Sequence, residues 1–369
     1  MNARLYFLLL GLFLINYQNA KAQYQNTRVT LNDSDQSETS IAVSPLNSNL
    51  LMSVWNDFQY SQGANEIIRG GFGFSTDGGN TWSTSILDRS DYPSAWECDP
   101  SAQIDTNGNA FFCYLMWDPD FKSICVSKTT DYGINWVHKE ICRDSNESEG
   151  GLDKPFMVVD NNTNDSLNGR IYFVWTNLNY PNSIWFSFSR DHGESFSAPL
   201  ELDSVPNAPG IAASLAPVSE QGTLSLPLLQ FSMPVVAPNG DVYVTWMDVE
   251  SSSYNGSLVK LRKSTNGGAT FQSITNGPSF GRIVGQDIGD ARVSNSPSLV
   301  VGTDNALYLT YDDWDSSGTY ALRVKFAKST NSGLSWNNTR TIGRIAEGKQ
   351  FFPSITIDTR NRGNAPLLV

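Results

Sequence analysis

One octapeptide pattern recurs five times along this chain and constrains its fold more than any other feature. It reads Ser/Thr-x-Asp/Asn-x-Gly-x-Ser/Thr/Asn-aromatic and occupies residues 75–82, 129–136, 189–196, 264–271 and 329–336. The third residue can accept hydrogen bonds from the backbone of its own turn, and Gly at the fifth place permits a positive φ. We therefore expect five hairpins fixed by structural residues, which are Asp77, Asp131, Asp191, Asn266 and Asn331.

A second unit, of the form strand, Asn/Gly-bearing turn and strand, precedes each octet. It occurs at residues 40–55, 100–117, 155–175, 234–246, 297–311 and 353–369. With one strand entering each octet and one leaving it, every repeat predicts a four-stranded antiparallel sheet. Six first units and five octets leave the last repeat incomplete, so its sheet is either short or cut by the end of this sequence.

The octet resembles the Asp box of sialidases and related propellers. This resemblance implies an all-β fold, a six-bladed β-propeller of four-stranded blades with five Asp boxes, in which each closing aromatic residue packs against a neighbouring blade. We expect Thr27–Leu31 to supply the outer strand of the sixth blade, because propellers close their ring to avoid a free sheet edge.

The first 22 residues have the pattern of an export signal, with Arg4, an apolar run from Leu5 to Ile15, and a small-x-small cleavage site ending at Ala22. The apolar run is shorter than the roughly 20 residues of a membrane-spanning helix. We therefore predict a secreted or periplasmic protein whose mature residues 23–369 form one propeller domain, without a membrane span and as a monomer.

Charge and histidine content exclude several classes of partner. The net charge of −12 disfavours nucleic acid and anionic membranes, both of which require a clustered basic surface. The only two histidines, His138 and His192, are far apart and lack partners at metal-ligand spacing. We expect no metal site and no cofactor, and an extracellular glycan or glycoprotein as the partner.

The four cysteines lie within one repeat, at Cys98, Cys113, Cys125 and Cys142. An exported protein meets an oxidising compartment, so we predict two disulfides. Three pairings are possible, and a hairpin centred near Pro119 favours Cys113 with Cys125 and Cys98 with Cys142.

The face opposite the Asp boxes is where the entries to the first strands and the exits of the second strands meet. The strand entries bring Glu38, Asp99, Asp153, Lys154, Asn295 and Gln350 to this mouth, and the exits bring Trp55–Asp57, Trp117–Asp118, Trp175–Asn177, Trp246–Asp248 and Asp312–Trp314. Paired carboxylates facing one cavity are the usual means of glycoside hydrolysis. The sequence predicts as catalytic candidates Asp99, Asp118, Asp153 and Asp248, and as substrate-binding candidates Arg69, Arg292, Trp117 and Trp314.

The resemblance to sialidases does not extend to their catalytic motifs. The family's enzymes have a Phe/Tyr-Arg-Ile-Pro motif, three arginines that clamp the substrate carboxylate, a Tyr/Glu nucleophile pair and an Asp acid/base. At the place of the first motif this chain has Thr39-Ser40-Ile41-Ala42. The arginines that the loops can bring to the mouth, Arg69, Arg143, Arg282, Arg292 and Arg344, lie in no family motif.

Two functions therefore stay open. The first is a secreted glycoside hydrolase of the exo-sialidase-like type acting on extracellular glycans, and the second is a non-catalytic propeller that binds glycan or protein at the mouth. Because the mouth is acidic, it repels a sialic acid carboxylate, and we expect weak or absent sialidase activity.

Overall fold

A computed structural model describes residues 26–60, 66–145, 151–163, 166–179, 181–205, 228–249, 257–281, 295–315, 321–342, 349–357 and 366–368. These residues contain strands and turns, and none of them lies in a helix. The export signal predicted at residues 1–22 lies outside the described residues. Among the residues described, no helix has the length and apolar character needed to cross a membrane.

Five four-stranded antiparallel sheets, which we call blades one to five, follow one another along the chain. Blade one contains β1 (Gln36–Val43), β2 (Leu51–Tyr60), β3 (Glu66–Ser75) and β4 (Ser83–Ile86). Blade two contains β5 (Trp96–Ile104), β6 (Ala110–Asp118), β7 (Phe121–Thr129) and β8 (Val137–Asp144). Blade three contains β9 (Leu152–Val159), β10 (Ile171–Asn177), β11 (Ser183–Ser189) and β12 (Leu200–Ser204).

Blade four contains β13 (Leu228–Val236), β14 (Val242–Val249), β15 (Ser257–Ser264) and β16 (Thr275–Phe280). Blade five contains β17 (Ser298–Val301), β18 (Leu307–Asp315), β19 (Ala321–Ser329) and β20 (Asn337–Ile342). A two-stranded sheet, β21 (Ile355–Ile357) with β22 (Pro366–Leu368), follows in the described part of the sixth repeat. The all-β propeller fold is confirmed, and a count of six complete blades stays a prediction.

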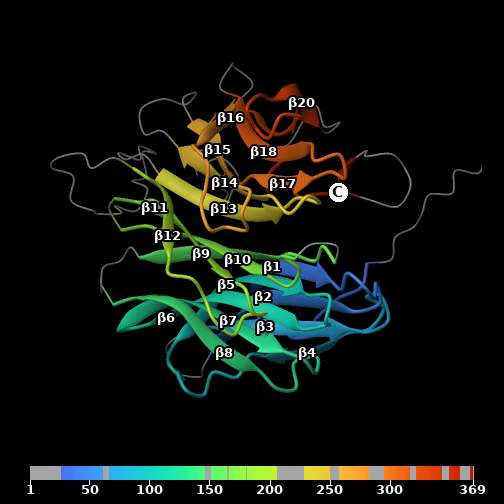
Figure 1. Cartoon of the computed structure of the whole chain (residues 1–369). Coiled ribbons are helices and arrows are strands. Elements are labelled where there is room, and N and C mark those ends of the chain that lie inside the picture. Colours follow the sequence, from blue (N-terminus) through green and yellow to red (C-terminus); the bar gives the residue numbers. More distant parts are fainter. Residues whose placement is uncertain are drawn as a thin grey trace, which may run out of the picture.

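The first strand of each blade lies nearest the middle of the molecule, and β4, β8 and β20 lie at the outside (Figure 1). A hydroxyl at one repeat position joins consecutive inner strands. Between blades one and two, Ser40 Oγ accepts from Ala102 N at 3.2 Å. Between blades two and three, Ser101 Oγ accepts from Met157 N at 3.3 Å. Between blade five and the sixth sheet, Ser298 Oγ accepts from Ile355 N at 3.2 Å. The inner strands are therefore held together in chain order around the middle.

The hydrophobic core is divided into layers between neighbouring blades. Blades one and two share a layer that contains Phe72 and Phe112, and later layers join blade two to three, three to four, four to five, and five to the sixth sheet. The closing aromatic residues of the Asp boxes enter these layers, since Trp136 meets Phe72 at 5.1 Å and Phe271 meets Phe186 at 4.8 Å between ring centroids.

The Asp boxes have the hairpin chemistry that the sequence predicts. In the first box, Thr81 N donates to Asp77 Oδ1 at 2.9 Å and Gly79 N donates to Ser75 Oγ at 2.8 Å. The same bonds recur in the other four boxes. The fifth-place glycine always has a positive φ, from 83° to 90°, and the fourth residue has one as well.

The predicted outer strand at 27–31 is wrong, because this segment has no strand in the structure. Polar contacts hold it beside blade one instead. Arg28 Nη2 donates to Asn32 O at 3.0 Å, and Asn32 Nδ2 lies 3.2 Å from both carboxylate oxygens of Asp57 at the mouth end of β2.

The predicted disulfides are wrong too, because all four cysteines are free. Cys113 pairs in register with Val126, and Cys125 pairs with Tyr114, one residue further along β6. Neighbouring residues of a strand face opposite sides of the sheet, so Cys125 enters the core layer toward blade one and Cys113 the layer toward blade three. Cys98 and Cys142 are on β5 and β8, three strand spacings or about 14 Å apart, which is beyond disulfide reach.

Candidate functional site at the propeller mouth

A bulge near the start of the inner strand brings one side chain to the mouth from each of blades one to four. The strand register breaks around residues 38–39, 99–100, 154–155 and 231–232. Glu38, Asp99, Lys154 and Phe231 accordingly have φ values of 54°, 54°, 47° and 56°, and Phe352 before β21 has 52°. Bulges of this kind redirect side chains and are common beside active sites. The antiparallel strand order puts them on the face opposite the Asp boxes.

The bulge residues of blades one, two and three form one ionic cluster. Lys154 Nζ donates to Asp99 Oδ1 at 2.6 Å and also to Glu38 Oε1. Asn56, which is buried in β2, joins the two acids: its Nδ2 donates to Glu38 Oε2 at 3.1 Å and its Oδ1 accepts from Asp99 N at 3.0 Å. One ammonium and one amide thus fix two carboxyl groups from different blades.

The two carboxyl groups differ in protonation. Partial desolvation at the mouth raises the pKa of Glu38 to about 7 although 38% of its side chain stays exposed, and a hydrogen bond to Asp99 and the charge of Asp99 act in the same direction. Burial opposes ionisation of Asp99 as well, but the hydrogen bond from Glu38 and the charge of Lys154 together hold its pKa below the ordinary value. The proton that this pair shares is therefore held on Glu38 in preference to Asp99, and Glu38 loses it as the pH rises through about 7.

A third carboxyl group, Asp153, adjoins the pair. Gln230 Nε2 of blade four donates to Asp153 Oδ2 at 2.9 Å. Burial and the nearby charge of Asp99 raise the pKa of Asp153 to about 6. The structure thus brings together Asp99 and Asp153, two of the four predicted catalytic residues, and adds contributions from blades one and four.

Aromatic side chains occupy the bulge position in blade four and in the sixth repeat, as Phe231 and Phe352. Phe231 is half-buried, and Phe352 is half-exposed, with its ring 5.5 Å from that of Phe351. The bulge residues are therefore ionic in blades one to three and aromatic in blade four and the sixth repeat. Beside Phe352, the buried Asp312 of blade five accepts from Ser296 N at 3.3 Å, and burial raises its pKa to about 7.

An exposed indole lies on the rim of blade two. Trp117 retains 41% of its surface, and its ring centroid lies 5.4 Å from that of Trp96, which enters the strand leading to Asp99. Lys122 Nζ lies 4.1 Å above the Trp117 ring. Of the two tryptophans predicted to bind substrate, Trp117 offers a surface for stacking, whereas Trp314 is 4% exposed and lies in the interior.

The remaining predicted carboxylates are separate from the cluster. Asp118 caps the tip of the β6–β7 hairpin by accepting from Asp120 N at 3.1 Å. Asp248 forms an ion pair with Lys260 at 2.6 Å, and Lys260 also contacts Asp203 of blade three at 3.3 Å. Lys260 therefore joins blades three and four and engages Asp248 within blade four.

The described arginines near the mouth are engaged by protein groups. Arg69 Nη1 contacts Glu97 Oε1 at 3.0 Å and Ala95 O at 2.8 Å, and its Nη2 donates to Pro93 O, which binds blade one to blade two. Arg143 donates twice to Glu140. The other candidates, Arg282, Arg292 and Arg344, lie outside the described residues.

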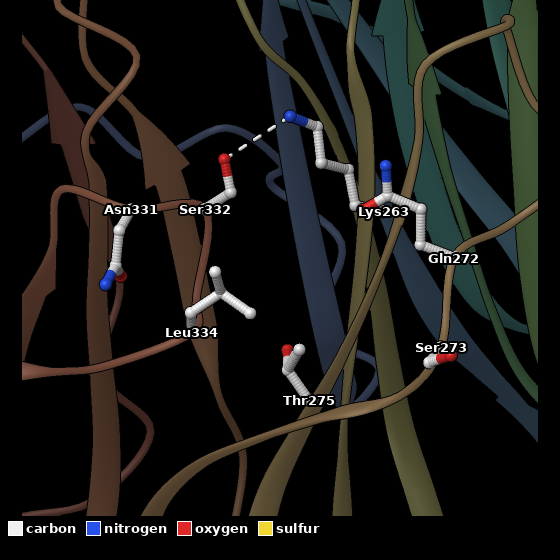
Figure 2. A pocket seen from close by; sticks show the side chains of 7 residues that line it. All are labelled: Lys263, Gln272, Ser273, Thr275, Asn331, Ser332 and Leu334. Carbon is white, nitrogen blue, oxygen red and sulfur yellow. Dashed lines mark hydrogen bonds between the residues drawn. The ribbon is translucent and has the colours of Figure 1, made fainter.

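A cavity of about 320 Å³ lies on the Asp-box face between blades four and five (Figure 2). Lys263 Nζ donates to Ser332 Oγ at 3.3 Å across it, and Leu334 and the Asp-box residue Asn331 line it. Its lining residues include no carboxyl group. We therefore place the functional site at the mouth, where titratable groups converge.

The roles of Glu38, Lys154 and Asn56 are not apparent from residue type alone. Glu38 and Lys154 are expected at the mouth, but the ion pairs that connect blades one, two and three are visible only in the folded chain. A usable signal exists in the repeat, because Glu38, Asp99 and Lys154 all lie one or two residues before the first-strand unit of their repeats.

No protein-family model and no curated protein sequence matches this chain. Its fold does match solved structures. An α-L-arabinanase of Penicillium chrysogenum complexed with arabinobiose superposes with a TM-score of 0.56 at 12% identity, over 89% of this chain and 87% of that one. An α-L-arabinofuranosidase of Fusarium graminearum gives 0.59 at 11% identity, over 92% and 90%.

A sialidase of Streptococcus pneumoniae has the same fold as well, with a TM-score of 0.56 at 10% identity, over 90% of this chain and 65% of the sialidase. The fold-level resemblance to sialidases that the Asp boxes predict is therefore confirmed. Identities this low establish a common architecture and do not transfer residue roles.

Proposed function

We propose that this protein is a glycoside hydrolase that cleaves glycans at the propeller mouth, with Glu38 as the general acid and Asp99 as its ionised partner. The observation that carries the proposal is geometric: Lys154 Nζ pairs with both Glu38 and Asp99, two carboxyl groups that different blades bring together at the mouth, and the pKa of Glu38 is raised while that of Asp99 is lowered. Two carboxyl groups in different protonation states are what glycosidic cleavage requires.

Each neighbour of the pair has a role in this chemistry. Glu38 transfers its proton to the glycosidic oxygen while the carbon–oxygen bond breaks and its electron pair moves to that oxygen. A water molecule from solvent then adds its oxygen to the anomeric carbon and gives a proton to the Glu38 carboxylate, which restores the acid. Asp99 stabilises the positive charge that develops on the sugar ring. Lys154 keeps Asp99 ionised, Asn56 orients the Glu38 carboxyl group and holds the Asp99 backbone N–H, and the ring of Phe352 supplies an apolar surface for the sugar.

The substrate class follows from charge. The ionic cluster at the mouth contains three carboxyl groups and one ammonium, and Arg69 is already bound by Glu97. An anionic sugar meets repulsion there, so we infer that neutral glycosides are preferred over sialosides. The fold match to an arabinanase, an arabinofuranosidase and a sialidase supports a carbohydrate substrate. We further propose that the protein is exported and acts on extracellular glycans.

One observation favours a second candidate, a non-catalytic glycan-binding propeller. Lys154 forms ion pairs with both Glu38 and Asp99, and a lysine that holds both acids in place also suits a purely structural or binding role. The same mouth then binds a sugar through hydrogen bonds and aromatic contact without cleaving it.

Hydrolysis of chromogenic glycosides by the purified chain separates the candidates. The panel includes an α-L-arabinofuranoside, other neutral pyranosides and a sialoside, and the variants are Glu38→Gln and Asp99→Asn. Both variants should lower the rate roughly 100-fold to 10,000-fold, the usual contribution of acid–base catalysis. Asp33→Asn, at a side chain that is 99% exposed, is the control and should retain activity.

Activity that survives in both variants contradicts the assignment of these residues. Efficient sialoside cleavage contradicts the preference for neutral sugars. Sugar binding without hydrolysis of any member of the panel selects the binding candidate.

A further inference from the structure

A groove of about 380 Å³ runs along the seam between blades two and three, a volume within the ~300–1,000 Å³ range of small-ligand sites. Asp144 at the end of β8 lines its blade-two side, and Leu152, Asn177, Trp185 and Glu201 line it across all four strands of blade three. Neighbouring strands are ~4.8 Å apart, so the groove extends about 14 Å from β9 to β12.

The inner end of the groove adjoins the ionic cluster. Leu152 lines the groove and the next residue, Asp153, belongs to the cluster. In the β9–β10 register Leu152 pairs with Asn177 and Asp153 with Thr176, so the two regions are consecutive steps along the same pair of strands. The groove therefore begins one residue away from the ionic cluster, at the mouth end of blade three.

The lining chemistry suits a sugar. Trp185 is partly exposed, with its Nε1 donating to Ser183 Oγ at 2.8 Å, and it pairs across the strands with the buried Trp175. Amide and carboxylate groups lie beside it, since Asn179 Nδ2 donates to Asp144 Oδ2 at 2.8 Å. A fixed indole face next to hydrogen-bonding groups matches the alternating apolar and hydroxyl surfaces of a sugar ring.

Charge again excludes anionic sugars. Asp144 and Glu201 line the groove, and the guanidinium of Arg143 is neutralised by Glu140, with its Nε and Nη2 at 2.9 and 2.6 Å from the carboxylate. The ring of Phe121 lies 3.7 Å from the same guanidinium. The residues that line this groove therefore present carboxylates to the carboxylate of a uronate or sialyl unit, and their one arginine is already paired with Glu140.

We infer that this groove binds further units of a neutral oligosaccharide whose reacting unit occupies the mouth, so that the protein acts on polymeric glycans. The inference rests on the proposed function for the position of the reacting unit. The binding site itself follows from the groove and its lining.

The test measures binding by calorimetry with full-length Glu38→Gln protein, which removes the acid. The probes are neutral α-1,5-arabino-, β-1,4-xylo- and β-1,4-gluco-oligosaccharides, each from disaccharide to hexasaccharide. At least one series should bind more tightly with length. Trp185→Ala should remove that gain, weakening the longer members about threefold to tenfold and leaving the disaccharide unchanged.

Trp185→Phe retains an aromatic face and should recover most of the gain. Glu201→Ala, on the exposed outer strand, reports on the same groove if Trp185→Ala unfolds, and should weaken only the longer members. The inference is overturned if no series binds, if affinity does not depend on length, if both groove variants weaken all lengths equally, or if an oligogalacturonate binds more tightly than the neutral series. Length-dependent binding by a protein that hydrolyses no glycoside refutes the proposed catalysis and leaves the groove assignment standing.

Discussion

Gly133 provides a quantitative test of how the Asp boxes hold the blades together. It is the fifth-place glycine of the second box, with φ at 85°. A Cβ placed there meets Phe72 Cε2 of blade one at 2.5 Å and Phe74 Cε2 at 3.1 Å. Gly108 in the β5–β6 turn has a similar φ of 81°, but a Cβ there has no atom within 4 Å. Both positions therefore require a left-handed backbone, but only at Gly133 would an added methyl group collide with buried side chains.

The expected destabilisation differs by the packing contribution. Alanine in a left-handed conformation costs about 1–2 kcal/mol at both positions. At Gly133 the added methyl group displaces two buried phenylalanines, and overpacking of this kind costs about 1–3 kcal/mol more. We therefore expect Gly108→Ala to reduce the free energy of unfolding by about 1–2 kcal/mol and Gly133→Ala by about 2–5 kcal/mol.

Urea unfolding followed by tryptophan fluorescence measures both variants against the parent chain. Sugar binding at the mouth, measured below the unfolding transition, should be unchanged in either variant, because both turns lie on the opposite face. Equal destabilisation by the two substitutions would show that the second Asp box does not pack against blade one as described.

Three further predictions follow from the titrating groups and the thiols. If Glu38 is the acid, hydrolysis should fall as pH rises through about 7, where Glu38 loses its proton. Lys154→Met should move the acidic limb of the pH–rate profile to higher pH, because Lys154 lowers the pKa of Asp99. A pH–rate profile that neither Glu38→Asp nor Lys154→Met changes argues against these roles. Asp77→Ala should lower the melting temperature without changing sugar binding at the mouth. Hydrogen bonds from Thr81 lower the pKa of Asp77 from 3.8 to about 2. The stabilisation of the fold by ionised Asp77 is therefore present above pH 3.8 and lost as pH falls through 2. Thiol titration of the denatured, unreduced protein should find all four cysteines reactive, and a smaller number refutes the free-thiol arrangement.

The fold was predictable because its main signal is local. The Asp-box octet specifies its own turn through contacts among residues 75 to 81 and their equivalents, so reading the repeat predicts the hairpins, the blades and the face opposite the boxes. The disulfide prediction failed on register. Cys113 and Cys125 are one residue out of register, so their side chains face opposite sides of the sheet. The spacing of the two cysteines around the hairpin does not by itself specify this register.

The candidate site was predictable as a face and only partly as residues. Asp99 and Asp153 were identified because they lie at inner-strand entries, and both belong to the cluster. Asp248 lies at an equally plausible strand exit, but Lys260 engages it between two blades. The selection among mouth carboxylates depends on contacts across blades, which connect residues more than 50 positions apart, such as Asp99 and Lys154.

The inner-strand bulge has a consequence for how such a protein can change over evolution. Glutamate, aspartate, lysine and phenylalanine all occupy the same left-handed position in successive repeats. The local backbone path thus accommodates acidic, basic and aromatic side chains alike, and a single codon change at one of these places alters what faces the ligand while the surrounding sheet is retained. Duplicated repeats of this kind provide several independently variable positions around one axis, which allows ligand preference to diverge while the scaffold is conserved.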